Sequence, residues 1–332
     1  MTQPETVARK PRPLTLTVVL PVYNNGDCLP ELYQRLTAAF IQAGLQDYEI
    51  ICVDDGSRDD SREVIRRLRE TDARVKLIQL TRNFGHQFAI TAGFDLSSGD
   101  AVLVMDADLQ DPPEAIPDFL AKWREGYDVV YGVRLDRAGE SRFKRLTASL
   151  FYRVLRKLTK TEIALDSGDF RLLSRRAMDS FNQLRERARF VRGMVSWLGY
   201  RQTPVYYNRA ARWAGKSQYS LGRLVRLAFD AVVSFSDVPL RIATWVGFLG
   251  VSVCIAYFVY IMIANALWGV PVQGWASLVA VVLFIGCVQL TILGMMGQYI
   301  GRMYDELKGR PLYLIADLVG FDGTKDGLDV QF

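Results

Sequence analysis

The sequence is poor in cysteine and histidine, and it lacks the short motifs of several common nucleotide-binding folds. Its four cysteines, Cys28, Cys52, Cys254 and Cys287, have no spacing typical of a metal site. We expect them to be reduced thiols in a cytosol-facing protein. Neither the glycine fingerprint GxGxxG nor the phosphate loop GxxxxGK[ST] occurs, so neither of those nucleotide sites is available.

The N-terminal residues contain no apolar segment of the kind that directs secretion. The sequence begins MTQPETVARKPRP, which is basic and rich in proline. We therefore expect no secretory signal and a disordered tail over residues 1–14. The formal net charge is +5, but no nucleic-acid-binding motif accompanies it. Because basic residues cluster near apolar segments, the expected partner is a membrane with anionic lipid and not nucleic acid.

Charge is absent from one long stretch of the chain. Between Arg241 and Arg302 there is no Asp, Glu, Lys, Arg or His. Within it, Ile242–Trp268 and Trp275–Ile300 each exceed the roughly 20 residues needed to cross a bilayer. Basic residues flank the stretch but are missing from its central connection, so the positive-inside rule places both flanks in the cytoplasm. We expect a two-helix transmembrane hairpin over 241–301; the alternative is a pair of buried helices in a soluble protein.

Two flanking segments complete the expected membrane region. Tyr219–Phe235 has a broad apolar face with Arg223 and Arg226 near its edge, which suits a helix lying in a membrane interface. An ordinary surface helix packed on a sheet is the alternative. We expect an amphipathic juxtamembrane helix over 216–240 and a cytosolic C-terminal tail over 302–332. The protein would then be a multi-pass inner (plasma) membrane protein with both termini in the cytoplasm. Glycines in both apolar runs would permit close helix packing and hence a homo-oligomer.

Residues 15–215 alternate apolar strands with amphipathic helices. The expected strands are Leu14–Leu20, Tyr48–Val53, Val75–Leu80, Ala101–Met105 and Asp128–Gly132, with Val205–Asn208 at an edge; the expected helices are Cys28–Ala43, Asp60–Thr71 and Phe88–Leu96. This alternation predicts an α/β domain with a mostly parallel, Rossmann-like sheet. In such sheets ligands bind beyond the carboxyl ends of the strands. The side chains expected along that crevice are Tyr23, Asp54, Asp55, Asp106 and Asp108.

The segment VLVMDADLQDPP carries the strongest chemical signal. Asp106 and Asp108 follow an apolar strand, and alternation along an extended chain would direct both to one side. Paired carboxylates repel each other unless a cation lies between them, and Mg²⁺ or Mn²⁺ binds carboxylates together with substrate phosphates. Gln110 would add an amide oxygen. We therefore expect a metal site made of Asp106, Asp108 and Gln110; the alternative is an acidic surface loop in which the pair occurs by chance.

The order of short motifs along the chain resembles one family. LPVYNN, VDDGS, RNFGH, DADLQDPPE, SGDFRLL and RWAGKS precede the two apolar runs, as in family 2 glycosyltransferases, which have the nucleotide-sugar-binding GT-A fold. Within that family the chain looks like the polyprenyl-phosphate glycosyltransferases, which include dolichol-phosphate mannose synthase. It looks most like the bactoprenol glucosyltransferases of the Gtr type. The resemblance covers about Leu16–Ser217 and the layout of the two apolar runs, and it implies inversion at the sugar carbon.

The resemblance also implies which residues bind the nucleotide. They are Pro21, Tyr23, Asn25, Val53, Asp55 and Arg212. Tyr23 would contact the base and Asp55 would accept one of its N–H groups, while Asp54 braces the turn. A plain turn is the alternative for the Asp54–Ser57 segment. His86 is the only histidine, and we expect it to cap a turn beside this pocket instead of acting in catalysis.

A second group of residues would serve the acceptor. By resemblance the acceptor phosphate contacts Arg134, Arg145 and Ser149, since a lipid phosphate needs charge-assisted donors. A solvated basic helix is the alternative for Arg145. The expected catalytic residues are Asp106, Asp108, Arg134 and Asp169, with Asp169, or alternatively Asp111, orienting the sugar. A phosphate monoester is already mostly ionised at pH 7, so no general base is required.

The resemblance leaves the sugar open. UDP-glucose as donor and undecaprenyl phosphate as acceptor are the expected substrates, and GDP-mannose or a UDP-aminopentose would use nearly the same motifs. A processive polysaccharide synthase would carry a QxxRW-type motif and several spans, and neither occurs in the sequence. A non-catalytic scaffold is disfavoured by the intact acidic, basic and aromatic positions.

Overall fold

The computed structural model describes residues 15–135, 167–208, 238–268 and 274–321. The chain divides into two compact units. The first comprises Met1–Ala148, Thr161–Gln218 and Arg310–Phe332, and the second comprises Ser149–Lys160 and Tyr219–Gly309. The expected N-terminal tail and nearly all of the expected juxtamembrane helix lie outside the described residues.

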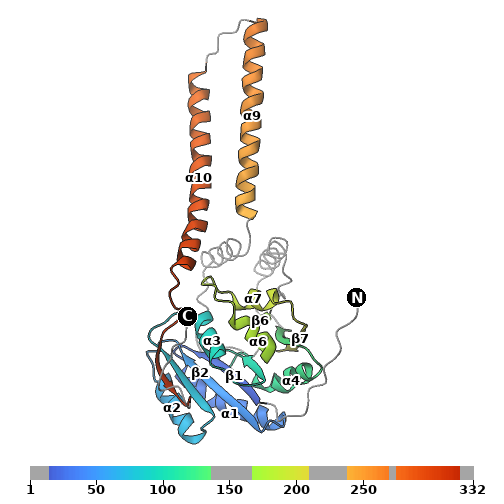
Figure 1. The fold of residues 1–332 in the computed structure, drawn as a ribbon, viewed down its shortest axis with the longest axis vertical. Coiled ribbons are helices and arrows are strands. Elements are labelled where there is room, and N and C mark those ends of the chain that lie inside the picture. The colour runs from blue at the N-terminus through green and yellow to red at the C-terminus, as the bar shows by residue number, and fades with distance from the viewer. Residues whose placement is uncertain (1–14, 136–166, 209–237, 269–273, 322–332) are drawn as a thin grey trace. The chain divides into compact units, whose positions relative to one another are not determined.

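The described part of the first unit is built on an eight-stranded sheet (Figure 1). In chain order the strands are β1 (Thr15–Val22), β2 (Asp47–Asp54), β3 (Val75–Leu80), β4 (Ala101–Val104), β5 (Val129–Arg134), β6 (Ser167–Ser174), β7 (Gln202–Tyr207) and β8 (Ile315–Val319). Their order across the sheet is β7-β5-β6-β4-β1-β2-β3-β8. β4, β1, β2 and β3 are mutually parallel, as are β5 and β7, whereas β6 and β8 run antiparallel to their neighbours. The predicted α/β, mostly parallel sheet is confirmed.

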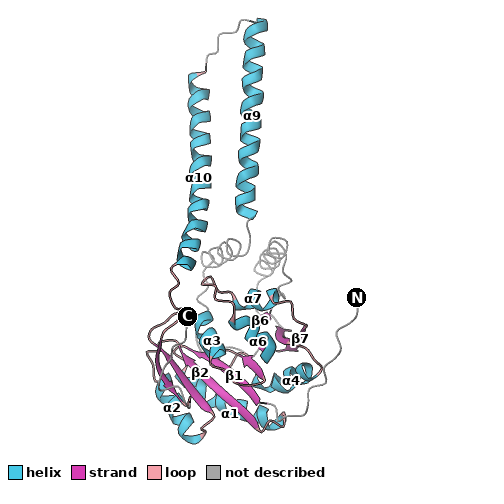
Figure 2. Cartoon of the chain, viewed as in Figure 1, coloured by secondary structure: helices cyan, strands magenta, loops and turns pink. Residues whose placement is uncertain are grey.

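Helices cover both faces of this sheet (Figure 2). Alternate residues of a strand point to opposite faces, so Val18 and Leu20 of β1 join one buried cluster and Val19 joins the other. The first cluster includes residues of α1 (Leu29–Gln42), α2 (Ser61–Thr71) and α4 (Ile116–Arg124). The second includes residues of α3 (His86–Asp95), α6 (Arg175–Asn182) and α7 (Val191–Trp197). Apolar alternation in the strands therefore produces a three-layer α/β/α arrangement.

The strand β1 is longer than predicted, since Pro21 and Val22 belong to it and not to the turn. The carbonyl of Val19 points toward β4 and accepts from the backbone N–H of Met105, so the backbone of Pro21, two residues later, faces the same side. β4 has already ended at Val104. The missing N–H of Pro21 therefore costs no ladder hydrogen bond, and the strand continues through it.

The strand β8 was not predicted from the sequence. It pairs antiparallel with β3, and Arg66 of α2 forms an ion pair with Asp317 on it. Five residues without a clean polar–apolar alternation give too weak a pattern to identify a strand. The described end of the chain therefore forms part of the sheet.

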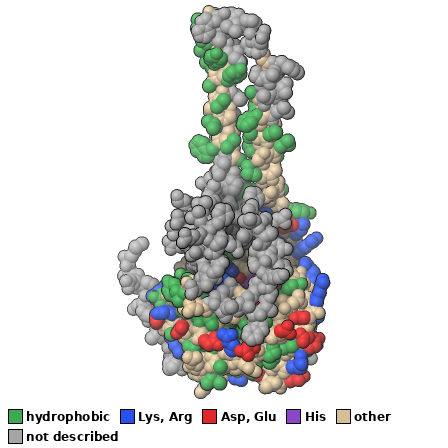
Figure 3. Space-filling view, turned by 180° about the vertical axis from the view of Figure 1, so that it is seen from behind, with side chains coloured by type: hydrophobic (Ala, Val, Ile, Leu, Met, Phe, Trp, Pro, Cys, Tyr) green, Lys and Arg blue, Asp and Glu red, His purple; other side chains and the backbone are tan. Residues whose placement is uncertain are grey.

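The second unit contains two long helices, α9 (Val238–Trp268) and α10 (Trp275–Leu307), which lie side by side. Ala243–Tyr260 has a mean hydropathy of 1.7 and Phe284–Leu307 a mean hydropathy of 1.3, and only 6% and 0% of these windows are buried. Figure 3 shows hydrophobic side chains along both helices, whereas charged side chains of both signs lie among hydrophobic and other groups on the visible surface of the first unit. Both helices are long and apolar enough to cross a membrane, and their exposure disfavours the alternative of buried core helices.

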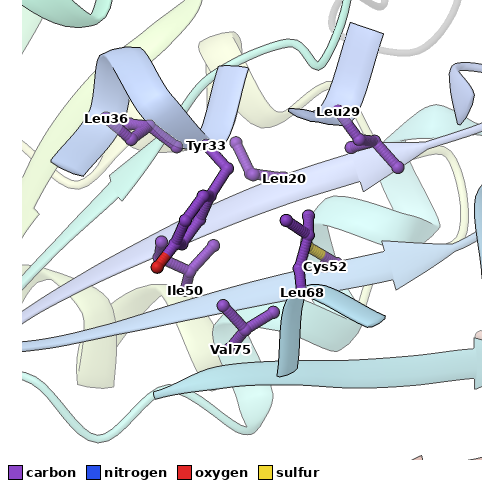
Figure 4. Close-up of a pocket in the computed structure, with 8 residues that line it drawn as sticks. All are labelled: Leu20, Leu29, Tyr33, Leu36, Ile50, Cys52, Leu68 and Val75. Carbon is purple, nitrogen blue, oxygen red and sulfur yellow. The ribbon is translucent and has the colours of Figure 1, made fainter. Parts of the chain in front are cut away.

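A small cavity of about 10 Å³ lies between α1, α2 and the sheet (Figure 4). It is lined by Leu20, Leu29, Tyr33, Leu36, Ile50, Cys52, Leu68 and Val75. The Tyr33 hydroxyl is engaged, because it donates to Asp72 at 3.1 Å. A cavity of this size holds at most one water, and an apolar lining leaves it dry. It is a packing void and not a ligand site.

Candidate active site

One edge of the sheet gathers most of the predicted functional side chains. The carboxyl ends of β1, β2, β4, β5 and β7 lie at this edge, as does the first part of the antiparallel strand β6. β4 and β6 are paired with Val104 opposite Arg171. Asp106 lies two residues after Val104, and Asp169 lies two residues before Arg171. Because the two strands are antiparallel, both carboxylates arrive at the same edge.

The turn after β4 holds the predicted metal ligands. β4 ends at Val104 and the chain turns at Ala107 and Asp108, so the expectation of an extended segment through Asp108 is wrong. Leu109 has a φ of 60°, an uncommon conformation for a bulky residue, and its side chain is buried in the core. The backbone N–H of Gln110 donates to Asp108 Oδ1 at 3.1 Å. A tight turn, anchored by Leu109, therefore presents this acidic sequence.

Asp106 lies where negative charge accumulates. Its Oδ1 atom is buried and has no hydrogen-bond partner among the described residues. Burial, together with the negative charges of Asp111, Asp169 and Asp108, raises the pKa of Asp106 to about 6, against the opposing effect of His86. His86 Nε2 lies 3.4 Å from this oxygen as an ion-pair partner. A carboxylate oxygen without a hydrogen bond, among further carboxylates, also suits a bound cation.

The described residues supply an incomplete cation site. Among them, no group of three or more His, Cys, Asp or Glu side chains is arranged to hold a metal ion. The donors fit a hard ion that takes one or two carboxylates from the protein and completes its shell with water and substrate phosphates. Asp106 and Asp108 match that requirement, because Asp108 is close enough to influence the pKa of Asp106.

Asp169 is held by two cationic side chains. Arg192 of α7 donates to both of its oxygens at 2.8 and 3.0 Å, and His86 Nε2 lies 3.2 Å from Oδ2. Burial alone would raise the pKa of Asp169, but the hydrogen bonds from His86 and Arg192 outweigh it and the pKa is lowered. Asp169 is therefore a fixed anion. Sequence reasoning missed Arg192, since nothing distinguishes it from the other arginines of a basic chain.

His86 differs from its predicted place. It is the first residue of α3, and its side chain faces Asp169 and Asp106, at 3.2 and 3.4 Å, instead of capping a turn. Burial lowers the pKa of His86, but the hydrogen bond to Asp169 and the nearby carboxylates outweigh burial and raise it. The interpretation of His86 as a turn cap is wrong.

The turn after β2 is fastened to the RNFGH segment. The backbone N–H groups of Phe84 and Gly85 donate to the two oxygens of Asp55 at 2.7 and 2.9 Å. Gly56 has a φ of +75°, and a Cβ there would lie 2.7 Å from the backbone nitrogen of Asn83. Burial raises the pKa of Asp55 more than these two hydrogen bonds lower it. Asp55 thus holds the segment that carries His86.

Asp54 braces its own turn, as predicted. Its Oδ1 accepts from the backbone N–H of Ser57 at 3.0 Å, and its Oδ2 accepts from Arg62 at 2.6 Å. The side chain is fully buried. A buried carboxylate with these two partners fixes the turn that presents the neighbouring Asp55.

The predicted nucleotide residues at the ends of β1 and β2 are close in space. Pro21 lies opposite Val53 in the sheet, and both are buried. Tyr23, the next residue after β1, is 45% exposed, and its backbone N–H donates to Asn25 Oδ1 at 3.3 Å. An exposed aromatic ring at a strand end offers a surface on which a planar base can stack.

The predicted acceptor residues are only partly described. Arg134 ends β5 and lies opposite Tyr207 of β7. Arg145 and Ser149, and the nucleotide residue Arg212, lie outside the described residues. The structure therefore brings Arg134 to the same edge as Asp106 and Asp169, and the other three residues stay predictions.

The α/β/α fold and its acidic edge agree with the GT-A fold expected from the sequence. The model of the glycosyl transferase family 2 matches residues 17–181. The chain is 43% identical to the uncharacterized glycosyltransferase YkcC of Bacillus subtilis (strain 168), over 95% of this chain and 97% of that protein. It is 39% identical to the bactoprenol glucosyl transferase of Shigella phage SfII, over 91% and 97%. The chain belongs to glycosyl transferase family 2.

A further relative and a solved structure are also similar to this chain. A prophage bactoprenol glucosyl transferase homolog of Escherichia coli (strain K12) is 37% identical over 91% of this chain and 98% of its own length. The crystal structure of glucosyl-3-phosphoglycerate synthase from Mycobacterium tuberculosis, in complex with Mn²⁺, UDP and phosphoglyceric acid, is 19% identical with a TM-score of 0.44, covering 66% of this chain and 76% of that one.

Proposed function

We propose that this glycosyltransferase moves glucose from UDP-glucose to undecaprenyl phosphate at the cytosolic face of the inner membrane, with inversion at the sugar carbon. Relatives named as bactoprenol glucosyl transferases align with nine-tenths of the chain, which includes both long helices. The structural observation that carries the proposal is the buried Oδ1 of Asp106, which accepts no hydrogen bond from the described residues and lies beside further carboxylates, with His86 as a cationic neighbour at 3.4 Å. A site of that charge suits a cation that in turn binds a diphosphate.

The proposed metal site consists of Asp106, Asp108 and Gln110. Mg²⁺ or Mn²⁺ bound there would act as a Lewis acid on the leaving nucleoside diphosphate. The protein contributes the fixed turn, since Leu109 anchors it in the core and the Gln110 N–H orients the Asp108 carboxylate.

The proposed nucleotide site uses Pro21, Tyr23, Asn25, Val53, Asp55 and Arg212. Tyr23 supplies the exposed ring and Asp55 the acceptor for a base N–H. Each Asp55 oxygen already accepts one backbone N–H, but a carboxylate oxygen has two lone pairs, so one more donor fits. Because those two bonds fix the carboxylate, the base would meet an acceptor that needs no reorientation.

The proposed acceptor site uses Arg134, Arg145 and Ser149. The lipid phosphate is mostly ionised at pH 7, so the nucleophile needs no base and the protein has only to hold it near the sugar. The lowered pKa of Asp169 supports this view, because a carboxylate whose proton affinity is reduced is a poor general base. Asp169 instead orients the sugar.

The membrane topology belongs to the same proposal. Helices α9 and α10 would cross the inner membrane, with the connecting residues outside and the family 2 domain in the cytoplasm. The support is their length, their hydropathy and the absence of charge from Ile242 to Gly301. Labelling of single cysteines introduced at residue 271 and in the cytosolic domain, in intact cells, tests the orientation.

The activity is tested with purified protein, undecaprenyl phosphate, Mg²⁺ or Mn²⁺ and a panel of radiolabelled nucleotide sugars. We expect lipid-soluble label from UDP-glucose. Label only from GDP-mannose or a UDP-aminopentose would keep the enzyme class and change the sugar. Labelled polymer without labelled lipid would indicate a processive synthase. Absence of both nucleotide-sugar binding and sugar transfer would indicate a non-catalytic scaffold.

A further inference from the structure

Three side chains from three parts of the chain form a connected set beside the acidic turn. The Tyr207 hydroxyl donates to Asp111 Oδ1 at 2.6 Å, and Arg134 Nε donates to the same hydroxyl at 3.3 Å. Arg134 Nη2 lies 3.7 Å from Asp111 Oδ1. Tyr207 thus links the last aspartate of the DADLQD segment to the arginine at the end of β5.

Burial separates the roles of these three residues. The Asp111 side chain is 0% exposed and Tyr207 is 5% exposed, whereas the Arg134 side chain is 25% exposed. A fully buried carboxylate does not reach a sugar or a metal ion in solution. Of the three side chains, only the guanidinium of Arg134 is accessible to a ligand. Its ionic partner, Asp111, lies on its buried side, so its exposed side stays open to an anion.

The surrounding backbone is shaped to this arrangement. A Cβ on Gly132 would lie 2.6 Å from the Tyr207 ring, and a Cβ on Gly168 would lie 2.9 Å from Arg134 Nη2. The Phe170 ring packs edge-on against Tyr207, with ring centroids 5.5 Å apart. Two glycines therefore leave room for the tyrosine ring and for the guanidinium, and the Phe170 ring fixes the tyrosine.

The hydrogen bond to Tyr207 uses Arg134 Nε. The two terminal nitrogens of an arginine carry the donors that recognise a phosphate in a bidentate manner. The hydrogen bond from Nε fixes the plane of the guanidinium and does not use the N–H groups of the two terminal nitrogens. Since Arg134 pairs in register with Tyr207 at the ends of neighbouring strands, the fork is fixed relative to the edge that bears Asp106 and Asp169.

We propose that Asp111 and Tyr207 are positioning residues that hold Arg134 as the receptor for the acceptor phosphate. Asp111 is then neither a metal ligand nor a residue that orients the sugar. The identity of the anion as a lipid phosphate rests on the proposed function. The contacts among Asp111, Tyr207 and Arg134 are observed independently of it.

The test compares Tyr207→Phe with the full-length wild-type protein in detergent. Loss of one hydrogen bond predicts a KM for undecaprenyl phosphate raised on the order of fivefold, with kcat and the KM for UDP-glucose within about twofold. In an Arg134→Ala background the same substitution should change nothing further, since its effect passes through the arginine. The control is Tyr206→Phe on the same strand, because Tyr206 is 59% exposed. The proposal would be overturned if Tyr207→Phe raised the KM for both substrates equally. It would also be overturned if Tyr207→Phe raised the KM for the lipid as much in the Arg134→Ala background as in the wild type.

A second variant and a binding measurement keep the outcome decisive. If Tyr207→Phe fails to fold, Gly168→Ala displaces the guanidinium and leaves the Tyr207–Asp111 bond intact, and it should also raise the KM for the lipid selectively. Direct binding of undecaprenyl phosphate, without a sugar donor, separates this proposal from the proposed function. Wild-type protein that binds the lipid but transfers no glucose contradicts the function alone. Arg134→Ala protein that binds it as tightly as wild type contradicts Arg134 as the phosphate receptor, and with it the positioning role of Asp111 and Tyr207, but leaves the proposed glucose transfer standing.

Discussion

Nε2 of His86 lies 3.2 Å from Oδ2 of Asp169, and this contact joins the first turn of α3 to the start of β6. The carboxyl has a lowered pKa and the imidazole a raised one, each against the effect of burial. Both shifts favour the charged forms, an imidazolium beside a carboxylate. The positive charge also lies 3.4 Å from Asp106, where it opposes the repulsion among the acidic groups.

The first prediction concerns that charge. His86→Gln removes it, so we expect kcat to fall by about tenfold or more, whereas His86→Lys, which keeps a cation, should recover much of the loss. Single-turnover transfer rates at saturating substrate provide the measurement. Equal activity of the glutamine and lysine variants would show that the charge of His86 does not matter.

The second prediction concerns the acidic turn. Asp108→Asn removes a negative charge and a hard oxygen donor, so glucose transfer should fall by at least about 100-fold while the protein folds and inserts normally. Asp118→Asn, on the exposed side of α4, is the control. The assay is lipid glucosylation, with circular dichroism and Mn²⁺ binding measured in parallel. Wild-type turnover by the Asp108 variant would refute the metal assignment.

The third prediction compares two glycines that both have positive φ. Gly56→Ala would place a methyl 2.7 Å from the Asn83 nitrogen, whereas a Cβ on Gly44 meets nothing within 4 Å. Both changes carry backbone strain, but only the first also separates the turn after β2 from the RNFGH segment. We expect Gly56→Ala to raise the KM for UDP-glucose several-fold more than Gly44→Ala. Equal KM values for the two variants, measured by initial rates, would contradict the nucleotide role of that turn.

The fourth prediction is a pH dependence of stability. Glu49 accepts from Thr17, Ser98 and Lys76, and although burial raises its pKa, these bonds outweigh burial and lower it. A lowered folded pKa stabilises the protein above the unfolded value of about 4.5, and this contribution is lost as pH falls through the folded pKa. Glu49→Gln should therefore reduce stability at pH 7 by about 2 kcal/mol.

The measurement is thermal unfolding of both proteins between pH 3 and pH 8. The difference in Tm should be constant from pH 6 to pH 8 and shrink below about pH 4.5. Glu125→Gln, which removes an exposed ion pair with Lys122, should have little effect at any pH. A Tm difference that grows on acidification would contradict the account of Glu49.

The sheet could be largely predicted, because apolar strands ending in polar residues give a strong local pattern. β3 has the predicted bounds. β1 begins at Thr15 and continues through Pro21 to Val22, whereas the prediction was Leu14–Leu20. β8 was missed, since its place is set by pairing with β3 and not by its own five residues. The end of β4 was predicted at Met105, one residue too late. The turn that ends this strand is anchored by Leu109, which lies five residues beyond Val104, so the local apolar pattern does not reveal it.

The site was harder to predict than the sheet. Asp106 and Asp169 are recognisable because carboxylates at strand ends are unusual, and the structure brings both to one edge. Arg192 and Tyr207 carry no such signal, since their roles arise from partners 23 and 96 residues away. His86 was noticed for its rarity, but its partner could not be identified before the register of β4 and β6 was known.

The most direct test of the central claim is mass spectrometry of the lipid product. Purified wild-type protein is incubated with UDP-glucose and undecaprenyl phosphate, with Mn²⁺ or with EDTA. We expect the mass of undecaprenyl phosphate to increase by one glucose residue with Mn²⁺ and to stay unchanged with EDTA. A lipid left unmodified while UDP is released, or transfer that EDTA does not affect, would contradict the central claim.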